Sequence, residues 1–180
     1  MGIQIGAKPD AGFDDPLGML KDCHRRIERF LGVLCLVAER ARGRAMTDEE
    51  SAAVQAALSY FRAGGQRHTR DEEDSLFPRM RAAGIDPAEI ERVGGLEHDH
   101  QVADNLHSEA DRLFTEWLEK SRLPAEEETA LLHGTEQLKA LYAKHIDVEE
   151  KQVFPCAAEH LDKTALAAMG QEFRARRATS

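Results

Sequence analysis

The sequence predicts an all-α protein: an up-down-up-down four-helix bundle built from two pseudo-repeated helix pairs, with short connecting and C-terminal helices in addition. Three observations support this fold class. Apolar residues recur at three- and four-residue spacing in four long segments. No segment alternates apolar and polar residues over the length of a strand. The links between the long segments are short, which favours antiparallel neighbours.

The first half of the chain carries two of the four helices. From Leu17 onward a helix with one apolar stripe runs to a breaker at Gly43; the stripe consists of Leu20, Ile27, Phe30, Leu31, Leu34 and Val37. Thr47 and Glu50 have the spacing of a capping box and open the second helix. We expect Pro78 to break or kink that helix, because proline lacks the backbone N–H.

The second half follows the same plan. Asp86 followed by Pro87 predicts the start of a short connecting helix. A third long helix is expected from about Gly95. The fourth opens near Pro124 with three glutamates in its first turn, where the positive end of the helix dipole favours them. From Asp162 the chain predicts a short final helix with a basic end.

The length of 180 residues suits one domain with short appendages. We expect a flexible N-terminal arm over 1–14, the bundle over 15–160 and a C-terminal helix or tail over 161–180. The net charge of −9 argues against nucleic-acid binding. The three cysteines form no C-x-x-C pair, no apolar run reaches the length of a membrane span, and the first residues lack the apolar stretch of a signal peptide. A cytoplasmic protein without membrane association is therefore expected.

A local pattern occurs twice in the chain. The stretch HTRDEEDSLFP at 68–78 has a second version, HIDVEEKQVFP, at 145–155. Both keep a histidine, two glutamates at the fourth and fifth positions after it, an aliphatic residue, Phe and Pro. Each is preceded at a matching distance by a further histidine on the previous predicted helix, His24 and His100. A repeated pattern of this kind indicates a repeated structural unit.

The helical period predicts which of these side chains meet. Residues at positions i and i+4 lie on one helix face, and antiparallel helices can bring such faces to one level of a bundle. We therefore expect four imidazoles and two carboxylates to converge in the core: His24, His68, Glu72, His100, His145 and Glu149. His98 fits the register worse, since it lies about 200° around the helix from His100. Glu73 and Glu150 are rotated by about 100° from their neighbours, so we expect them to face solvent.

Such a cluster favours a metal site. A single exposed His-x-x-x-acid pair is common and adds only a few tenths of a kcal/mol, but the duplicated pattern favours burial instead. Buried carboxylates and imidazoles need a neutralising cation, and mixed nitrogen and oxygen ligands suit Fe, Mn or Zn better than Mg or Ca. Six ligands exceed what one structural zinc uses. Two ions bridged by Glu72 and Glu149, with a position open to a small molecule, are therefore expected.

Three further residues are candidates for the surroundings of these ligands. His107 lies two turns after His100 on the same face, about 10.5 Å along the helix, where it would contact the ligands or line a channel. Glu28 and Asp104 each follow a histidine of the cluster by four positions. We expect both to be exposed, with a role in orienting an imidazole as the alternative.

The pattern H…H-x-x-x-E-E-x-x-L-F-P…H…H-x-x-x-E-E-x-x-V-F-P resembles the hemerythrin family, specifically the bacterial HHE-type hemerythrin-like domains, over roughly residues 17–160. The resemblance implies a four-helix bundle with a non-heme diiron centre. It implies terminal imidazole ligands and two bridging carboxylates, at the six positions given above, with Mn or Zn as substitutes for iron. Oxygen-carrying hemerythrins have a fifth histidine where this chain has Asp104. Either Asp104 or a water would be the ligand at that position, which favours sensing, redox chemistry or iron handling over stable O2 carriage.

The expected function is binding or sensing of O2, or of NO, at an open iron position, in a metal-binding protein rather than an enzyme. One alternative is a ferritin- or rubrerythrin-like oxidase or peroxidase. Those bundles use Glu-x-x-His twice, whereas this chain has it once, at Glu97 to His100. Another alternative is a regulatory bundle in which the metal only stabilises the fold. The sequence identifies no protein partner.

Overall fold

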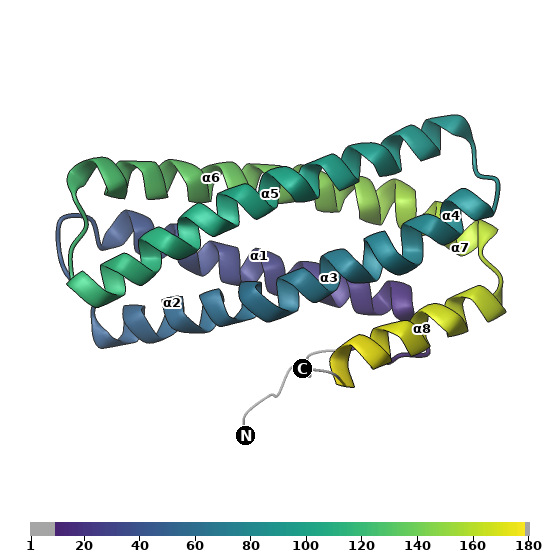
Figure 1. Cartoon of the computed structure of the whole chain (residues 1–180), viewed down its shortest axis with the longest axis horizontal. Coiled ribbons are helices and arrows are strands. Elements are labelled where there is room, and N and C mark those ends of the chain that lie inside the picture. The colour runs from purple at the N-terminus through teal and green to yellow at the C-terminus, as the bar shows by residue number, and fades with distance from the viewer. Residues whose placement is uncertain (1–9, 179–180) are drawn as a thin grey trace, which may run out of the picture.

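The computed structural model describes residues 10–178, which form a helical bundle without a strand among them (Figure 1). The all-α prediction is therefore confirmed. Successive long segments reverse direction at the ends of the bundle in Figure 1. The elements in chain order are α1 (Pro16–Arg40), α2 (Asp48–Tyr60), η1 (Phe61–Gly65), α3 (Gln66–Asp71), η2 (Glu72–Leu76), α4 (Phe77–Ala82), α5 (Pro87–Lys120), α6 (Ala125–Val148), η3 (Glu149–Val153), α7 (Phe154–His160) and α8 (Lys163–Ala178).

The predicted end of the first helix and the predicted start of the second are confirmed. The carboxylate of Asp15 accepts a hydrogen bond from the backbone N–H of Gly18 and caps α1. Gly43, just beyond the end of α1, has a φ of 72°, a conformation that glycine adopts without strain. Thr47 and Glu50 form both hydrogen bonds of the capping box at the start of α2.

One boundary in the second half differs from the prediction. Instead of a short connecting helix followed by a break near Gly95, α5 runs unbroken from Pro87 to Lys120. Its buried positions continue in one helical register across the glycines: Val93, Leu96, His100 and Ala103. Burial of this continuous face outweighs the low helix propensity of Gly94 and Gly95, which costs only about 1 kcal/mol per glycine.

Pro78 does not end its helix, so of the two predicted outcomes, a break or a kink, the break is wrong. It lies in α4, which follows η2 without interruption. The five-residue turn η2 is of the π type, and the N–H of Phe77 bonds to the carbonyl of Glu72 five positions back. This wider turn accommodates the missing N–H and the bulk of the proline ring. The turn η3 has the same place before the second proline of the repeat.

The apolar core consists of two clusters with a polar level between them. One includes Ile27, Phe61 and Leu138, and the other includes Leu20 and Leu76. Along each long segment, the histidines and glutamates of the repeat lie between residues of the first cluster and residues of the second. The bundle therefore buries these polar side chains under apolar layers on both sides.

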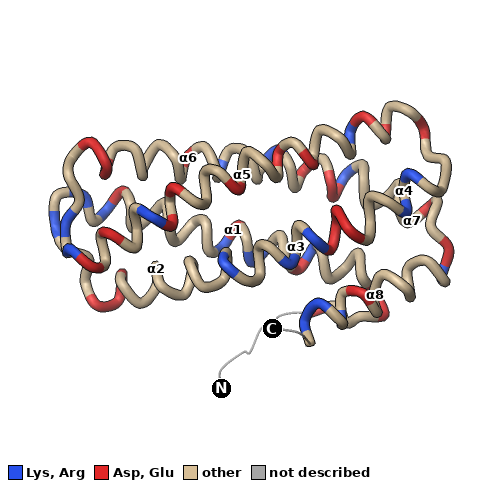
Figure 2. The backbone as a smooth tube through the Cα atoms, viewed as in Figure 1, with Lys and Arg blue, Asp and Glu red and all other residues tan. Residues whose placement is uncertain are grey.

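Helix α8 adds a layer against α1 and α3. Its apolar face buries Met169 and Phe173. Near its C-terminal end, Arg176 and Arg177 form ion pairs with the buried carboxylate of Asp71 at 2.8 and 2.6 Å. Figure 2 shows basic and acidic residues interspersed along the other helices, with basic residues at this end of α8. The predicted basic final helix is thus present.

The predicted N-terminal arm, residues 1–14, lies outside the described residues except for residues 10–14. Its last residues contact the helices. The backbone N–H of Ala11 donates a hydrogen bond to the carboxylate of Asp22 at 2.6 Å. The carbonyl of Phe13 lies so close to Gly170 of α8 that a Cβ atom there would be 1.9 Å from the oxygen. A side chain larger than hydrogen at position 170 would therefore displace this contact.

Candidate metal centre

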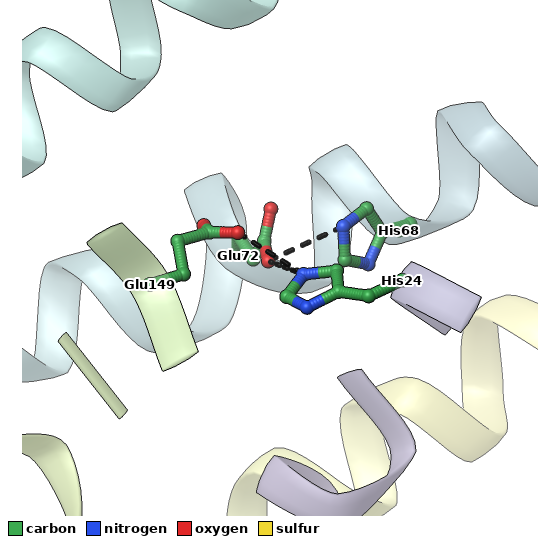
Figure 3. A group of neighbouring side chains, drawn as sticks. All are labelled: His24, His68, Glu72 and Glu149. Carbon is green, nitrogen blue, oxygen red and sulfur yellow. Dashed lines mark ion pairs between the residues drawn. The ribbon is translucent and has the colours of Figure 1, made fainter. Parts of the chain in front are cut away.

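The structure brings the six predicted residues together at the polar level of the bundle. Four segments supply them: α1, the continuous run from α3 into η2, α5, and the run from α6 into η3. All six side chains are buried, and none of the six residues is more than 4% exposed: His24, His68, Glu72, His100, His145 and Glu149. Figure 3 shows His24, His68, Glu72 and Glu149 directed toward one another.

These residues form two overlapping groups of four. One contains His24 and His68, and the other contains His100 and His145; Glu72 and Glu149 belong to both. Within each group the ligand-type atoms all lie within 4.8 Å of one another. Each group is of a size that one cation can bridge.

The two carboxylates are oriented to serve both groups. Oε1 of Glu72 lies 3.4 Å from Nε2 of His68, while Oε2 of the same carboxylate lies 3.3 Å from Nε2 of His100. Oε2 of Glu149 lies 3.0 Å from Nε2 of His24 and 3.4 Å from Nε2 of His145. Each carboxylate therefore faces imidazoles from both halves of the chain.

The residues present fit a bound cation. Within residues 10–178, several buried polar atoms have no hydrogen-bond partner: Nε2 of His24, His100 and His145, and all four carboxylate oxygens of Glu72 and Glu149. Leaving so many buried polar atoms unpaired is costly, because each loses its contact with water. Coordination of divalent cations by these nitrogen and oxygen atoms would remove that cost.

Three of the imidazoles each have a carboxylate from outside the cluster next to Nδ1. Glu150 lies 2.9 Å from Nδ1 of His24, and Glu73 lies 2.8 Å from Nδ1 of His100. Asp99 lies at 3.4 Å from Nδ1 of His145. Such a hydrogen bond fixes the ring and leaves Nε2 free to bind a cation. Among the described residues, Nδ1 of His68 has no such partner.

Two of these outer carboxylates differ from the prediction. Glu73 and Glu150 were expected in solvent, but they are half-buried and pair with imidazoles across the bundle. A rotation of about 100° from the inward face points a side chain sideways, and a long glutamate there reaches the neighbouring helix. The second glutamate of each repeat therefore holds the histidine of the other half.

The Phe of each Phe-Pro pair also contacts a histidine from the other half of the chain. The ring of Phe154 stacks on His24 with 5.4 Å between centroids, and the ring of Phe77 stacks on His100 at 6.3 Å. Both phenylalanines are fully buried. These contacts restrict the rotation of the two imidazoles and give the Phe of the repeat a place in the site.

The carboxylates change the proton affinity of the imidazoles. Burial alone would lower the pKa of His24, but the carboxylates of Glu149 and Glu72 beside its Nε2 raise that pKa to about 10. Glu72 and Glu73 raise the pKa of His100 to about 9 against the same effect of burial. At His68 burial dominates and lowers the pKa. Since metal ligands must be deprotonated, protons compete with cations at the first two imidazoles.

The structure does not bring the three surrounding candidates into the cluster. Glu28 and Asp104 are exposed. Within residues 10–178, neither side chain forms a hydrogen bond or ion pair with a histidine of the cluster. His107 instead hydrogen-bonds to the hydroxyl of Tyr142 at 3.1 Å, and burial lowers its pKa to about 4. His98 is exposed, as its register predicts.

Two missed residues had a signal in the sequence. The second glutamate of each repeat, at positions 73 and 150, is as regular as the first. The sequence contains no such signal for Asp99. This residue adjoins His100, but its carboxylate contacts the imidazole of His145 on another helix.

The fold and the site define a class: an all-helical bundle with a buried cluster of histidines and glutamates arranged for cations. Comparison with known families agrees, because the model of the Hemerythrin HHE cation binding domain matches residues 15–157. The chain belongs to this family. It is also similar to an uncharacterized protein of Haemophilus influenzae, with 26% identity over 167 residues that cover 93% of this chain and 92% of that protein. Of the helices within residues 10–178, none combines the length and apolar character needed to cross a membrane.

Proposed function

We propose that the six clustered residues bind two iron ions, with the imidazoles as terminal ligands and Glu72 and Glu149 as bridging carboxylates. The observation that supports this is the shared pair of carboxylates in two groups of four. The two oxygens of Glu72 face imidazoles of different groups, as a carboxylate between two ions would. The donor set of imidazoles and carboxylates suits iron and would also accept Mn or Zn.

We propose further that the bundle has the up-down-up-down order of four helices predicted above. The reversals of direction in Figure 1 and the close packing of α6 with both α1 and α5 support this order. In such a bundle each long segment contributes to one polar level, so the cluster needs the whole fold to form.

We propose O2, or NO, as the small molecule that the centre binds or senses. The ions would supply the affinity for such a diatomic molecule and the ability to exchange electrons with it. The chain supplies the environment. Apolar clusters on both sides exclude bulk water, and Glu150, Glu73 and Asp99 keep three imidazoles oriented toward the centre.

Metal content is the first test. The protein is purified without oxygen, and its metals are measured by elemental analysis. We expect about two iron ions per chain, as in other bundles with paired metal sites. The double variant His68→Ala/His145→Ala should lose them. The matched control, His133→Ala, removes an exposed imidazole of α6 and should keep them. A single zinc ion, or iron retained by the double variant, would contradict the two-iron proposal.

A second measurement tests the ligand. The reduced, iron-loaded protein is exposed to O2 or NO while its visible absorption is recorded. A new band that disappears when the gas is removed supports binding. Slow oxidation without any such band would overturn the proposed role in O2 binding, while leaving the metal site intact.

A further inference from the structure

A cavity of about 710 Å³ lies beside the metal centre. Its walls come from α1, the segment from α2 to η2, α5 and α6, and none of the six clustered residues lines it. This volume falls in the range of about 300–1,000 Å³ that small-molecule sites have. It is far larger than the roughly 30 Å³ that one water molecule takes up in the liquid. The cavity therefore has room for an organic molecule, much larger than a diatomic gas.

The inner surface of the cavity is largely apolar. It is lined by Leu34, Leu58, Phe61 and Ala110, all buried. The ring of His107 lies against Phe61 with 4.4 Å between centroids. The pair of His107 and Tyr142 is the polar part of this inner region, and its hydrogen bond is internal to the pair. An occupant would therefore present an apolar group to this end.

Most charged residues that line the cavity are already paired. Arg62 forms two hydrogen bonds with the carboxylate of Asp111, both at 2.6 Å. Arg112 pairs with glutamates of its own helix. Glu73 holds His100. These groups have their charges balanced within the protein.

Two opposite charges on the cavity walls remain. Within residues 10–178, the side chains of Arg70 on α3 and Asp104 on α5 form no hydrogen bond or ion pair, with each other or with other residues. An arginine presents a fork of donors that matches a carboxylate, and an aspartate accepts hydrogen bonds from an ammonium group. The cavity therefore offers complementary groups for both charges of a zwitterion, in addition to its buried apolar lining.

We propose that this cavity binds a free amino acid with an apolar side chain. Its carboxylate contacts the guanidinium of Arg70, its ammonium group contacts the carboxylate of Asp104, and its side chain lies over Leu34, Leu58 and Phe61. Single exposed ion pairs contribute little, so the two charges and the apolar contact act together. A molecule with one charge would leave one wall residue unpaired.

The test uses three probes with the same apolar group and different charges: L-phenylalanine, 3-phenylpropionate, which lacks the ammonium group, and 2-phenylethylamine, which lacks the carboxylate. Binding to the full-length, metal-loaded protein is measured by calorimetry. We expect L-phenylalanine to bind about two- to fivefold more tightly than either analogue. Equal binding of the three probes, or no binding of L-phenylalanine up to about 10 mM, would overturn the proposal.

Two variants identify which charge each residue recognises. Arg70→Gln should weaken binding of L-phenylalanine about two- to fivefold and leave 2-phenylethylamine unchanged. Asp104→Asn should weaken L-phenylalanine similarly and leave 3-phenylpropionate unchanged or bound more tightly. Both positions are exposed, so helicity and metal content should stay as in the original protein. If either variant weakened all three probes equally, with helicity intact, the assignment of the charges would be refuted.

Discussion

At the scale of single residues, Glu73 and Glu150 hold imidazoles that belong to the other half of the chain. Loss of such an outer hydrogen bond typically lowers metal affinity about 10- to 100-fold. We predict this loss for Glu73→Gln and for Glu150→Gln, measured by competition with a chelator. Glu28→Gln is the matched control, because Glu28 is an exposed glutamate on the same helix as His24. Equal affinities of the three variants would refute the positioning role.

Protons and cations should compete at the centre. When no cation is bound, His24 and His100 have pKa values of about 10 and about 9, so both are protonated at pH 7. Cation binding must release these protons, and we predict that affinity rises with pH until about pH 9–10. Calorimetry in two buffers with different ionisation enthalpies gives the number of protons released. An affinity that does not change between about pH 7 and 9 would contradict this prediction.

The raised pKa of His24 also determines whether the cation-free fold gains or loses stability as the pH rises. The pKa of His24 is raised from 6.5 to about 10 in the folded protein. Its protonated form therefore stabilises the cation-free fold fully below pH 6.5, and this stabilisation is lost as the pH rises through about 10. Denaturant unfolding of chelator-treated protein at several pH values measures it.

The sequence predicted the inward residues because they follow a strict helical period. It did not predict the partners of Glu73, Glu150 and Asp99. A period tells how far a side chain is rotated from the inward face, but the partner of a sideways glutamate depends on which helix lies beside it. The distance and angle between neighbouring helices are tertiary properties, set by the packing of the two apolar clusters.

At the scale of elements, α8 covers a charge next to the centre. Asp71 is fully buried, directly precedes Glu72 and pairs with Arg176 and Arg177. Arg177→Gln removes one partner of a buried carboxylate. We predict a loss of about 1–3 kcal/mol in the free energy of unfolding, measured with denaturant.

The control for this prediction lies on the same helix. Arg174 is exposed and lies over the ring of Phe13 at 4.9 Å from the centroid. Arg174→Gln should cost no more than about 1 kcal/mol, as expected for an exposed contact of this kind. A larger loss for Arg174→Gln than for Arg177→Gln would show that the pairing with Asp71 contributes little.

The boundaries of elements were predictable where a cap defines them, as at Thr47 and Asp86. They were not predictable where local and tertiary effects conflict. The glycines at 94 and 95 favour a break, but the buried face of α5 continues through them. Pro78 also favours a break, and a π turn absorbs its missing N–H. At the glycines, burial outweighs a local preference of about 1 kcal/mol per residue, whereas at Pro78 the wider turn removes the conflict itself.

At the scale of the whole molecule, the centre should couple metal binding to folding. Its unpaired buried atoms come from all four long segments, so a bound cation stabilises only the assembled bundle. A cation at 100 times its dissociation constant would add about 2.7 kcal/mol. For a chain of this size, that corresponds to roughly 5–10 °C in melting temperature.

This coupling is checked by calorimetric melting with and without a chelator. The melting temperature should rise with the concentration of free cation and fall when the cation is removed. The His133→Ala protein should follow the same curve, since its exposed imidazole is outside the centre. An unchanged melting temperature after removal of the metal by the chelator would refute the coupling.

The exchange of residues between the halves has a consequence for how such a protein can be built. Each half supplies two histidines and one glutamate to its own group of four and borrows a single glutamate from the other half. The outer glutamates and the stacked phenylalanines are exchanged in the same way. These contacts are reciprocal between the two halves, as the contacts in an isologous dimer are. Two copies of one helix pair could therefore assemble a complete centre, whereas one copy alone would lack a ligand in every group.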